Sequence, residues 1–114
     1  ITYTEMGDRD KAIEYFRRVI ELDDTYIKAY NNLGAALAQK GEFDSAVEVL
    51  EKAIEKDPKY PHSYKNLAMV YVQLKRPREA YENLSRYHDL EPRDQAALET
   101  LAKLRIAVAA DSTK

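Results

Sequence analysis

The sequence repeats itself with a period of thirty-four residues, and this period constrains the fold more than any other feature. The segment Tyr30-Asn-Asn-Leu33-Gly34 returns at this offset as Tyr64-Lys-Asn-Leu67-Ala68. Other residues recur in the same register: Ala12, Ala46 and Ala80; Phe16, Leu50 and Leu84; Glu14, Glu48 and Glu82; Gly7 and Gly41; Pro58 and Pro92. A period of this length is typical of repeat proteins, in which small units stack and share one hydrophobic core.

The period divides the chain into four parts. Residues 1–26 match the C-terminal part of a repeat, residues 27–60 and 61–94 are complete repeats, and residues 95–114 form a capping helix and tail. Because the first part is only a partial repeat and the chain does not begin with Met, we expect a fragment whose N-terminal end is cut and needs either an upstream repeat or another copy to cover it.

Each complete repeat has the pattern of two helices. Tyr30, Leu33 and Leu37 fall on one face of a first helix, and Gly41 favours its end because glycine readily adopts a positive φ. The residue before Pro58 avoids the helical region, so a second helix ends there. We expect a partial helix over 1–6 and helices near 9–22, 27–40, 43–56, 61–74, 77–90 and 95–109. The predicted fold class is all-α, an α-solenoid of helix-turn-helix repeats.

These residues resemble the tetratricopeptide repeat family. Its pattern of aromatic-x-x-Leu-Gly, then Ala-x-x-x-Phe, then Pro is best matched in the second unit, by Tyr30, Leu33, Gly34, Leu37, Gly41, Phe43, Ala46, Leu50, Ala53 and Pro58. Residues 95–110 resemble the extra helix that often follows the last repeat. The resemblance implies a protein-interaction scaffold whose first helices line a concave groove.

Two departures from the family pattern predict local differences. Lys75 stands where Gly41 stands one repeat earlier, so we expect a different turn in the third unit. Tyr87 occupies the position of Ala53, where the family has a small residue. We interpret the large phenol as packing against the capping helix, while a functional role for Tyr87 and His88 stays open.

The candidate binding face lies opposite the core face of each first helix. It comprises Lys28, Asn31, Asn32, Ala35, Ala38 and Gln39 in one repeat and His62, Lys65, Asn66, Met69, Val72 and Gln73 in the next. We expect Asn31, Asn32, Lys65 and Asn66 to contact the backbone and charges of a peptide, with Met69 and Val72 offering apolar contact.

Asn32 and Asn66 occupy the same repeat position. An amide both donates and accepts, so it can hold a peptide bond, and the resemblance implies a ladder of such amides along the groove. The alternative is that an exposed Asn is simply tolerated. The family's dicarboxylate clamp is incomplete, because His62 and Asn66 stand where the clamp has Lys and Arg.

Composition argues against several other functions. Eighteen Lys and Arg against twenty Asp and Glu give no basic excess, so we expect no nucleic-acid partner. No apolar run is long enough for a membrane span, so no direct membrane insertion is expected. The chain has no Cys, and His62 and His88 are its only histidines, so we expect no metal and no cofactor. No nucleophile or phosphate-loop motif occurs, which predicts a non-enzyme.

The sequence therefore predicts a non-catalytic scaffold that binds a peptide segment of a protein partner. Two alternatives stay open: a structural module that forms a homo-oligomer through the truncated N-terminal end, and a regulatory repeat region of a larger enzyme. A cytoplasmic location is expected, with a periplasmic or membrane-tethered one open if a leader was removed.

Overall fold

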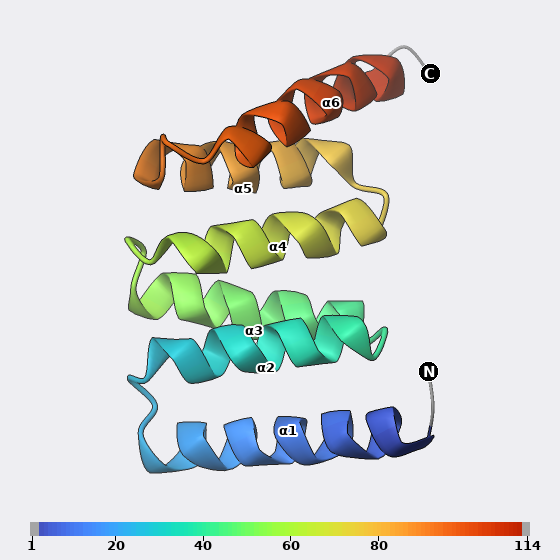
Figure 1. Cartoon of the computed structure of the whole chain (residues 1–114). Coiled ribbons are helices and arrows are strands. Elements are labelled where there is room, and N and C mark those ends of the chain that lie inside the picture. Colours follow the sequence, from blue (N-terminus) through green and yellow to red (C-terminus); the bar gives the residue numbers. More distant parts are fainter. Residues whose placement is uncertain (1–2, 113–114) are drawn as a thin grey trace. The chain divides into compact units, whose positions relative to one another are not determined.

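A computed structural model describes residues 3–112, and in this range the chain forms six α-helices and no strand (Figure 1). Side chains are described for residues 7–111. The helices are α1 (Tyr3–Leu22), α2 (Ile27–Gln39), α3 (Phe43–Lys56), α4 (Pro61–Gln73), α5 (Pro77–Leu90) and α6 (Gln95–Ser112). Within this range no helix combines the length and apolar character needed to cross a membrane.

The chain divides into two compact units, residues 1–58 and 59–114. The first contains α1, α2 and α3, and the second contains α4, α5 and α6. Within each unit, consecutive helices pack against each other in an antiparallel arrangement, as Figure 1 shows. The all-α class and the helix-turn-helix arrangement predicted from the 34-residue period are confirmed.

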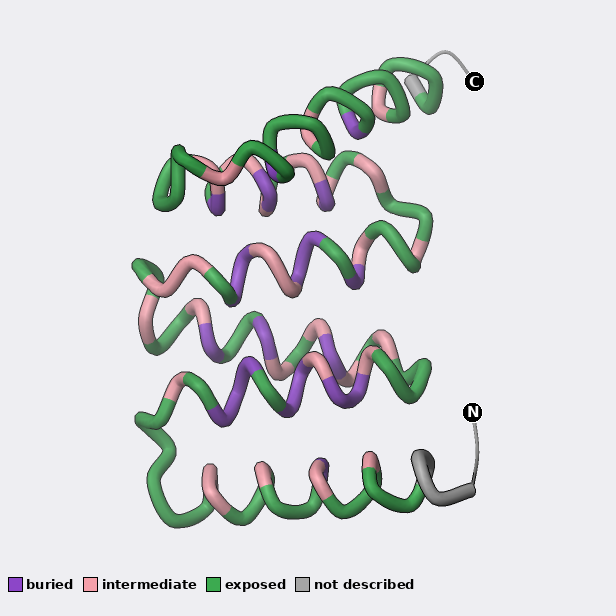
Figure 2. Tube along the Cα trace, viewed as in Figure 1, coloured by how far each residue is buried: buried purple, intermediate pink, exposed green. Residues whose placement is uncertain are grey.

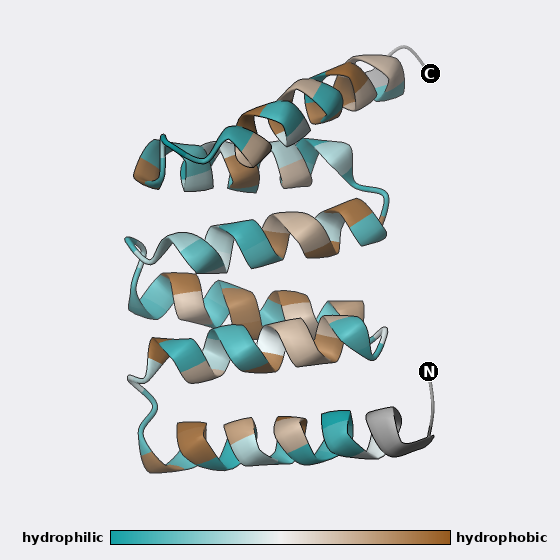
Figure 3. Ribbon diagram, viewed as in Figure 1, coloured by the Kyte–Doolittle hydropathy of each residue, from teal (hydrophilic) through white to brown (hydrophobic). Residues whose placement is uncertain are grey.

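The core of the first unit forms where α2 packs on α3 and α1. Its buried apolar residues are Ile13, Ala29, Tyr30, Leu33, Ala36, Leu37, Ala46, Leu50 and Ala53. Most of these positions lie on α2 and α3, while α1 is exposed along most of its length (Figure 2). Figure 3 shows the matching alternation of hydrophobic and hydrophilic residues along each helix. A stripe of this kind buries one face of each helix and leaves the other to solvent.

The second unit has an equivalent core between α4 and α5, which α6 partly covers. Its buried apolar residues are Tyr64, Leu67, Ala68, Val70, Ala80, Leu84, Tyr87, Ala97 and Leu104. Pro61 and Pro77 each begin a helix, where the missing N–H leaves no hydrogen bond unmade.

Gly7 does not end a helix, and the predicted break between a partial helix at 1–6 and a helix from residue 9 is wrong. Helix α1 runs without interruption from Tyr3 to Leu22. Among the described residues, Gly41 is the one glycine with a positive φ, at 89°, and Gly7 stays helical. Gly7 is exposed, and a Cβ built on it would have no atom within 4 Å. Its surroundings therefore do not require a glycine at this position. Residues 1 and 2 of the predicted partial helix lie outside the described range.

The turn at Lys75 is the same as the turn at Gly41, so the expected difference between them is also wrong. Lys75 has a φ of 60° and Gly41 a φ of 89°. In the first turn Gly41 N–H donates to Ala38 and Glu42 N–H to Leu37, at 3.0 and 2.9 Å. The equivalent N–H groups, those of Lys75 and Arg76, donate to Val72 and Tyr71, at 3.1 and 2.9 Å. Both are Schellman motifs, and the hydrogen bonds hold Lys75 in a left-handed conformation that a side chain disfavours.

Gly34 lies at a close crossing of α2 and α3. A Cβ at this position would stand 2.6 Å from Cγ and Cδ2 of Leu50, which is fully buried. The equivalent pair in the second unit is Ala68 and Leu84, where a Cβ is present and buried. The crossing of α4 and α5 therefore accommodates one more methyl group than the crossing of α2 and α3.

Candidate peptide-binding site

The predicted binding face of α2 is largely open to solvent. Lys28, Asn32 and Gln39 are exposed, and Ala35 and Ala38 are half-buried. Because α2 buries its Tyr30 and Leu37 face in the core, this opposite face is the part of the helix that a ligand can reach.

Asn31 is an exception, and its predicted role as a groove contact is corrected by its burial. Its side chain is 5% exposed, and its Nδ2 donates to the carbonyl of Ile27 at 3.3 Å. Both α1 and α3 pack against α2, so only a narrow part of the α2 surface is exposed to solvent. Asn31 falls inside the covered part, where its Nδ2 bonds to the backbone of its own helix and its Oδ1 is buried with no hydrogen-bond partner among the described residues.

An open pocket of about 440 Å³ lies between α1 and α2. Three predicted residues, Asn32, Ala35 and Gln39, line one wall. The remaining lining residues are Asp8, Arg9, Ala12, Phe16 and Ala36.

Two polar contacts connect the helices beside this pocket. Arg9 Nη1 donates to the carbonyl of Gln39 at 3.3 Å, and Lys40 Nζ lies 2.8 Å from Asp10 Oδ1. The hydrogen bond and charge of Asp10 raise the pKa of Lys40, which keeps that ammonium group charged. The pocket therefore combines an apolar floor with a rim of amide, guanidinium and carboxylate groups.

The predicted binding face of α4 is more apolar. Met69 is 59% exposed and Val72 is 44% exposed, although both are hydrophobic. Gln73 is exposed and Asn66 is half-buried. The imidazole of His62 is exposed and packs edge-on against the ring of Tyr60, with the ring centroids 5.6 Å apart.

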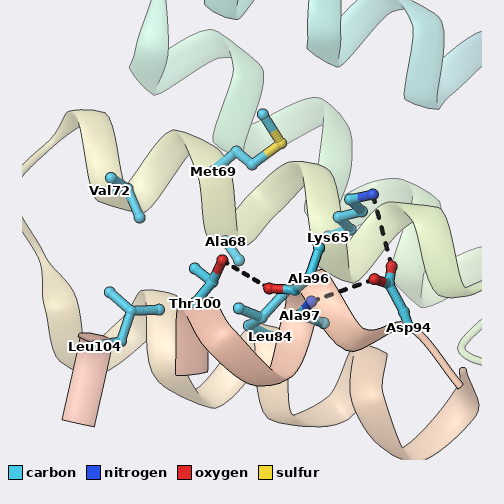
Figure 4. Close-up of a pocket in the computed structure, with 10 residues that line it drawn as sticks. All are labelled: Lys65, Ala68, Met69, Val72, Leu84, Asp94, Ala96, Ala97, Thr100 and Leu104. Atoms are coloured by element: carbon cyan, nitrogen blue, oxygen red, sulfur yellow. Dashed lines mark hydrogen bonds and ion pairs between the residues drawn. The ribbon is translucent and has the colours of Figure 1, made fainter. Parts of the chain in front are cut away.

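A second pocket, of about 200 Å³, lies between α4 and α6 with α5 beneath it (Figure 4). It brings together three predicted residues, Lys65, Met69 and Val72. The other lining residues are Ala68, Leu84, Asp94, Ala96, Ala97, Thr100 and Leu104. Figure 4 shows the Lys65–Asp94 pair at one end and Val72 with Leu104 at the other. Lys28, His62, Asn66 and Gln73 are not among the residues that line either pocket.

A polar network at this pocket connects all three helices of the second unit. Tyr87 of α5, 4% exposed, donates its hydroxyl to Asp94 Oδ2 at 2.5 Å. Asp94 precedes α6, and its Oδ1 accepts the N–H of Ala97 at 3.2 Å, as in an N-cap. Lys65 of α4 lies 3.9 Å from Asp94 Oδ2, and its Nζ lies 5.4 Å from the centre of the Tyr87 ring.

The hydrogen bond to Asp94, with burial and the nearby carboxylates, raises the pKa of Tyr87 to about 12. The same bond from Tyr87, with the N–H of Ala97, lowers the pKa of Asp94. Tyr87 therefore packs beside the last helix, as its departure from the family pattern suggested. Its partner Asp94 was not predicted, although the sequence places an N-cap residue type directly before the last helix.

Carboxylate and imidazole groups do not gather into a metal site in the described part of the chain, where no group of three or more His, Cys, Asp or Glu is arranged to hold an ion.

Helical hairpins that recur with a 34-residue period define the chain as a helical-repeat protein. The tetratricopeptide repeat family matches residues 3–68 and, in an overlapping second match, residues 37–104. The chain belongs to the tetratricopeptide repeat family. Members of this family are typically non-catalytic. No curated protein matches the chain.

Solved structures show the same fold. The crystal structure of YrrB, described as a TPR protein with an unusual peptide-binding site, is 25% identical with a TM-score of 0.76, over 85% of this chain and 50% of the YrrB chain. MamA is 25% identical with a TM-score of 0.83, over 94% and 58% of the two chains. The first TPR domain of human RPAP3 is 22% identical with a TM-score of 0.87, over 98% and 88%. The chain thus spans half the length of YrrB, and its likeness to RPAP3 is one of fold.

Proposed function

We propose that this chain is a non-catalytic scaffold that binds a peptide segment of a partner protein on the exposed faces of α2 and α4. The observation that carries the proposal is that predicted binding residues line an open pocket in each unit. Asn32, Ala35 and Gln39 line the first, and Lys65, Met69 and Val72 line the second. Each pocket offers apolar surface together with a few polar groups, the combination that recognises a peptide.

The comparison with YrrB supports the same function, because that protein shares the fold at 25% identity and has a peptide-binding site. We infer that Asn32 and Asn66, at one repeat position on α2 and α4, contact the ligand through their amides. Asn32 is exposed at the first pocket, and Asn66 is half-buried on the helix that lines the second.

The experiment selects short random peptides, displayed on phage, against the whole chain. Binders are then titrated by calorimetry against the wild-type chain and against the Asn32→Ala/Asn66→Ala double variant. We expect at least a tenfold loss of affinity, about 1.4 kcal/mol, in the double variant.

A Glu51→Ala/Glu55→Ala variant is the matched control, because both carboxylates are exposed on α3, away from the proposed face. Its affinity should equal that of the wild type. Failure to select any specific binder, or binders that ignore the two Asn substitutions, would contradict the proposal.

Self-association is a second candidate, favoured by apolar side chains that α1 leaves exposed. Tyr15 is 64% exposed and Leu22 is 89% exposed. Exposed apolar residues on one helix favour contact with a second molecule. Sedimentation equilibrium of the chain and of a Tyr15→Ser/Leu22→Ser variant tests this function. A dimer that the substitutions convert to monomer supports it, and a wild-type monomer at all concentrations contradicts it.

A further inference from the structure

The pocket between α4 and α6 is one end of a longer groove. The pocket of about 200 Å³ is the first cavity of this groove. A second cavity, of about 390 Å³, lies along the same two helices, and Val72 and Leu104 line both cavities. The second cavity extends to the α4–α5 turn at Lys75 and Arg76 and to Ala107, Ala110 and Asp111 near the end of α6. The two cavities therefore adjoin and form a continuous groove, here termed the α4–α6 groove.

The walls of the α4–α6 groove are mostly apolar. Met69 and Val72 present exposed hydrophobic side chains from α4, and Leu104 faces them from α6, with Leu84 of α5 beneath (Figure 4). The first cavity alone, at about 200 Å³, exceeds the roughly 150 Å³ that accepts a benzene-sized group. The groove can therefore hold apolar side chains of leucine or phenylalanine size.

Basic side chains stand at both ends of the groove. Lys65 lies at one end, and Lys75 and Arg76 lie at the other. The carboxylate of Asp94 is held by Tyr87 and the N–H of Ala97, and its distance to Lys65 is 3.9 Å. Arg76 has one long contact, 3.9 Å to Glu79, and Asp111 is the acidic residue at that end. The charge of Lys65 is thus offset by Asp94, whereas Lys75 and Arg76 outnumber Asp111 among the residues that line the other end of the apolar centre.

The polar groups inside the first cavity are already engaged within the protein. The Thr100 hydroxyl donates to the carbonyl of Ala96 at 3.0 Å, and the carboxylate of Asp94 accepts from Tyr87 and Ala97. An extended peptide would bring backbone N–H and C=O groups that need partners here. A helix satisfies its own backbone and offers only side chains, so it fits this lining better.

We propose that the α4–α6 groove binds an amphipathic helix of a partner protein, with acidic residues at the end of its apolar stripe that lies against Lys75 and Arg76. This assignment rests on the proposed peptide-binding function and specifies the ligand of the second unit. Lys65 lies eight residues before the end of α4 at Gln73, which is about 12 Å along the helix, and Lys75 and Arg76 follow in the turn. The ligand helix therefore carries about two turns of apolar residues, at i, i+3 or i+4, and i+7, next to its acidic end.

The test uses three fluorescein-labelled synthetic peptides and the whole chain. The first is a three-turn, helix-favouring peptide with a leucine stripe, two Asp at its N-terminus and two Glu at its C-terminus. The second has Lys in place of every acidic residue, and the third has Ser in place of every Leu. By fluorescence anisotropy we expect the first to bind at least tenfold more tightly than either comparator, with its affinity falling as salt is added.

Two protein variants locate the binding. Val72→Glu should abolish binding of the acidic-ended peptide, whereas Ile106→Glu, on a 71% exposed residue of α6 outside the groove lining, should not. The Lys75→Glu/Arg76→Glu variant should weaken the acidic-ended peptide and strengthen the Lys-ended one. Arg86→Glu/Arg93→Glu, on exposed residues outside the groove lining, should change neither. Circular dichroism confirms that each variant stays helical.

The outcomes separate this inference from the proposed function. Equal affinity for the acidic-ended and Lys-ended peptides, no binding of the leucine peptide, or binding that ignores Val72→Glu would overturn the inference. If any of these occurs while phage-selected peptides still depend on Asn32 and Asn66, the peptide-binding function stands and only its ligand class in the second unit is wrong.

Discussion

The hairpins α2–α3 and α4–α5 have the same helix lengths and the same turn, yet they differ at several equivalent positions. Their first helices are both 13 residues long, and their second helices are both 14. Gly34, Gly41 and Ala53 in the first hairpin correspond to Ala68, Lys75 and Tyr87 in the second. The repeat therefore sets the path of the backbone, while the substituted side chains set how each unit is packed and what its pocket contacts.

The pocket between α1 and α2 and the α4–α6 groove also differ because different side chains line them. The pocket beside α2 has Asp8, Arg9, Asn32 and Gln39 among its lining residues, whereas the α4–α6 groove presents Met69, Val72 and Leu104. Polar rims favour contact with an extended backbone, and apolar grooves favour the hydrophobic face of a helix. Two repeats of one family can thus present chemically different surfaces on the same scaffold.

The largest expected effect comes from Tyr87→Ala, which gives the second hairpin the small residue that the first has at Ala53. Tyr87 is 4% exposed, so its removal leaves a cavity between α5 and α6. We expect a loss of about 3–4 kcal/mol of unfolding free energy. Urea denaturation followed by circular dichroism measures it. Tyr15→Ala, on a 64% exposed ring, is the control and should cost less than about 1 kcal/mol; equal losses would contradict the packing role of Tyr87.

The next effect concerns the helix crossings. Gly34→Ala places a Cβ 2.6 Å from Leu50, and we expect this overpacking to lower the free energy of unfolding by about 1–2 kcal/mol. In a Leu50→Ala background the same substitution should instead be neutral or stabilising, because alanine is the better helix former and the space is free. A double-mutant cycle by thermal unfolding gives the coupling, and independent, additive effects would show that the crossing is not tight.

The reciprocal turn substitutions should have smaller effects of opposite sign. Lys75→Gly relieves a left-handed conformation and should stabilise the chain by about 1 kcal/mol. Gly41→Lys imposes that conformation and should destabilise the chain by a similar amount. Differential scanning calorimetry compares the two melting temperatures with the wild type. A destabilising Lys75→Gly would mean that the Lys75 side chain makes a stabilising contact that outweighs its backbone strain.

A separate expected effect is a pH dependence that comes from the Tyr87–Asp94 pair in the second unit. The pKa of Tyr87 is raised from 10.0 to about 12, so its stabilisation is complete below pH 10 and is lost as the pH rises toward 12. The pKa of Asp94 is lowered from 3.8, so its contribution is present above that pH and is lost as the pH falls further.

Urea unfolding midpoints, measured at acidic, neutral and alkaline pH, test both the alkaline loss of stability at Tyr87 and the acidic loss at Asp94. Tyr87→Phe should remove the part of the alkaline loss that belongs to Tyr87, while Tyr15→Phe leaves it unchanged. A midpoint that is as sensitive to alkaline pH in Tyr87→Phe as in the wild type would contradict the assignment.

The 34-residue period predicted the repeat fold, and the spacing of apolar residues within each repeat predicted which helix faces are buried. Tyr30, Leu33 and Leu37 recur with helical spacing, and burial of that face is what α2 shows. Helix ends were predicted well where a proline or a hydrogen-bonded turn fixes them, as at Pro61 and Gly41. Gly7 misled the prediction because a glycine ends a helix only where the following chain can form the capping bonds.

The details of the site were less predictable, because they depend on how neighbouring helices cover one another. Asn31 and Asn32 are adjacent in the sequence, yet one is buried and the other exposed. Lys75 shows that the backbone hydrogen bonds of a helix cap can impose a conformation that the residue type disfavours. The contact of Tyr87 with Asp94 joins residues seven apart across a loop, which periodicity alone does not reveal.

The central claim is that peptides bind on the faces of α2 and α4, and the most direct measurement is amide chemical-shift mapping by NMR with a phage-selected peptide. We predict that the largest changes occur on the pocket-lining side, at residues such as Asn32, Ala35, Met69 and Val72. The exposed side of α3, at Glu48 and Glu51, should be unaffected. Changes centred on α3 or α5, with α2 and α4 unperturbed, would contradict the claim.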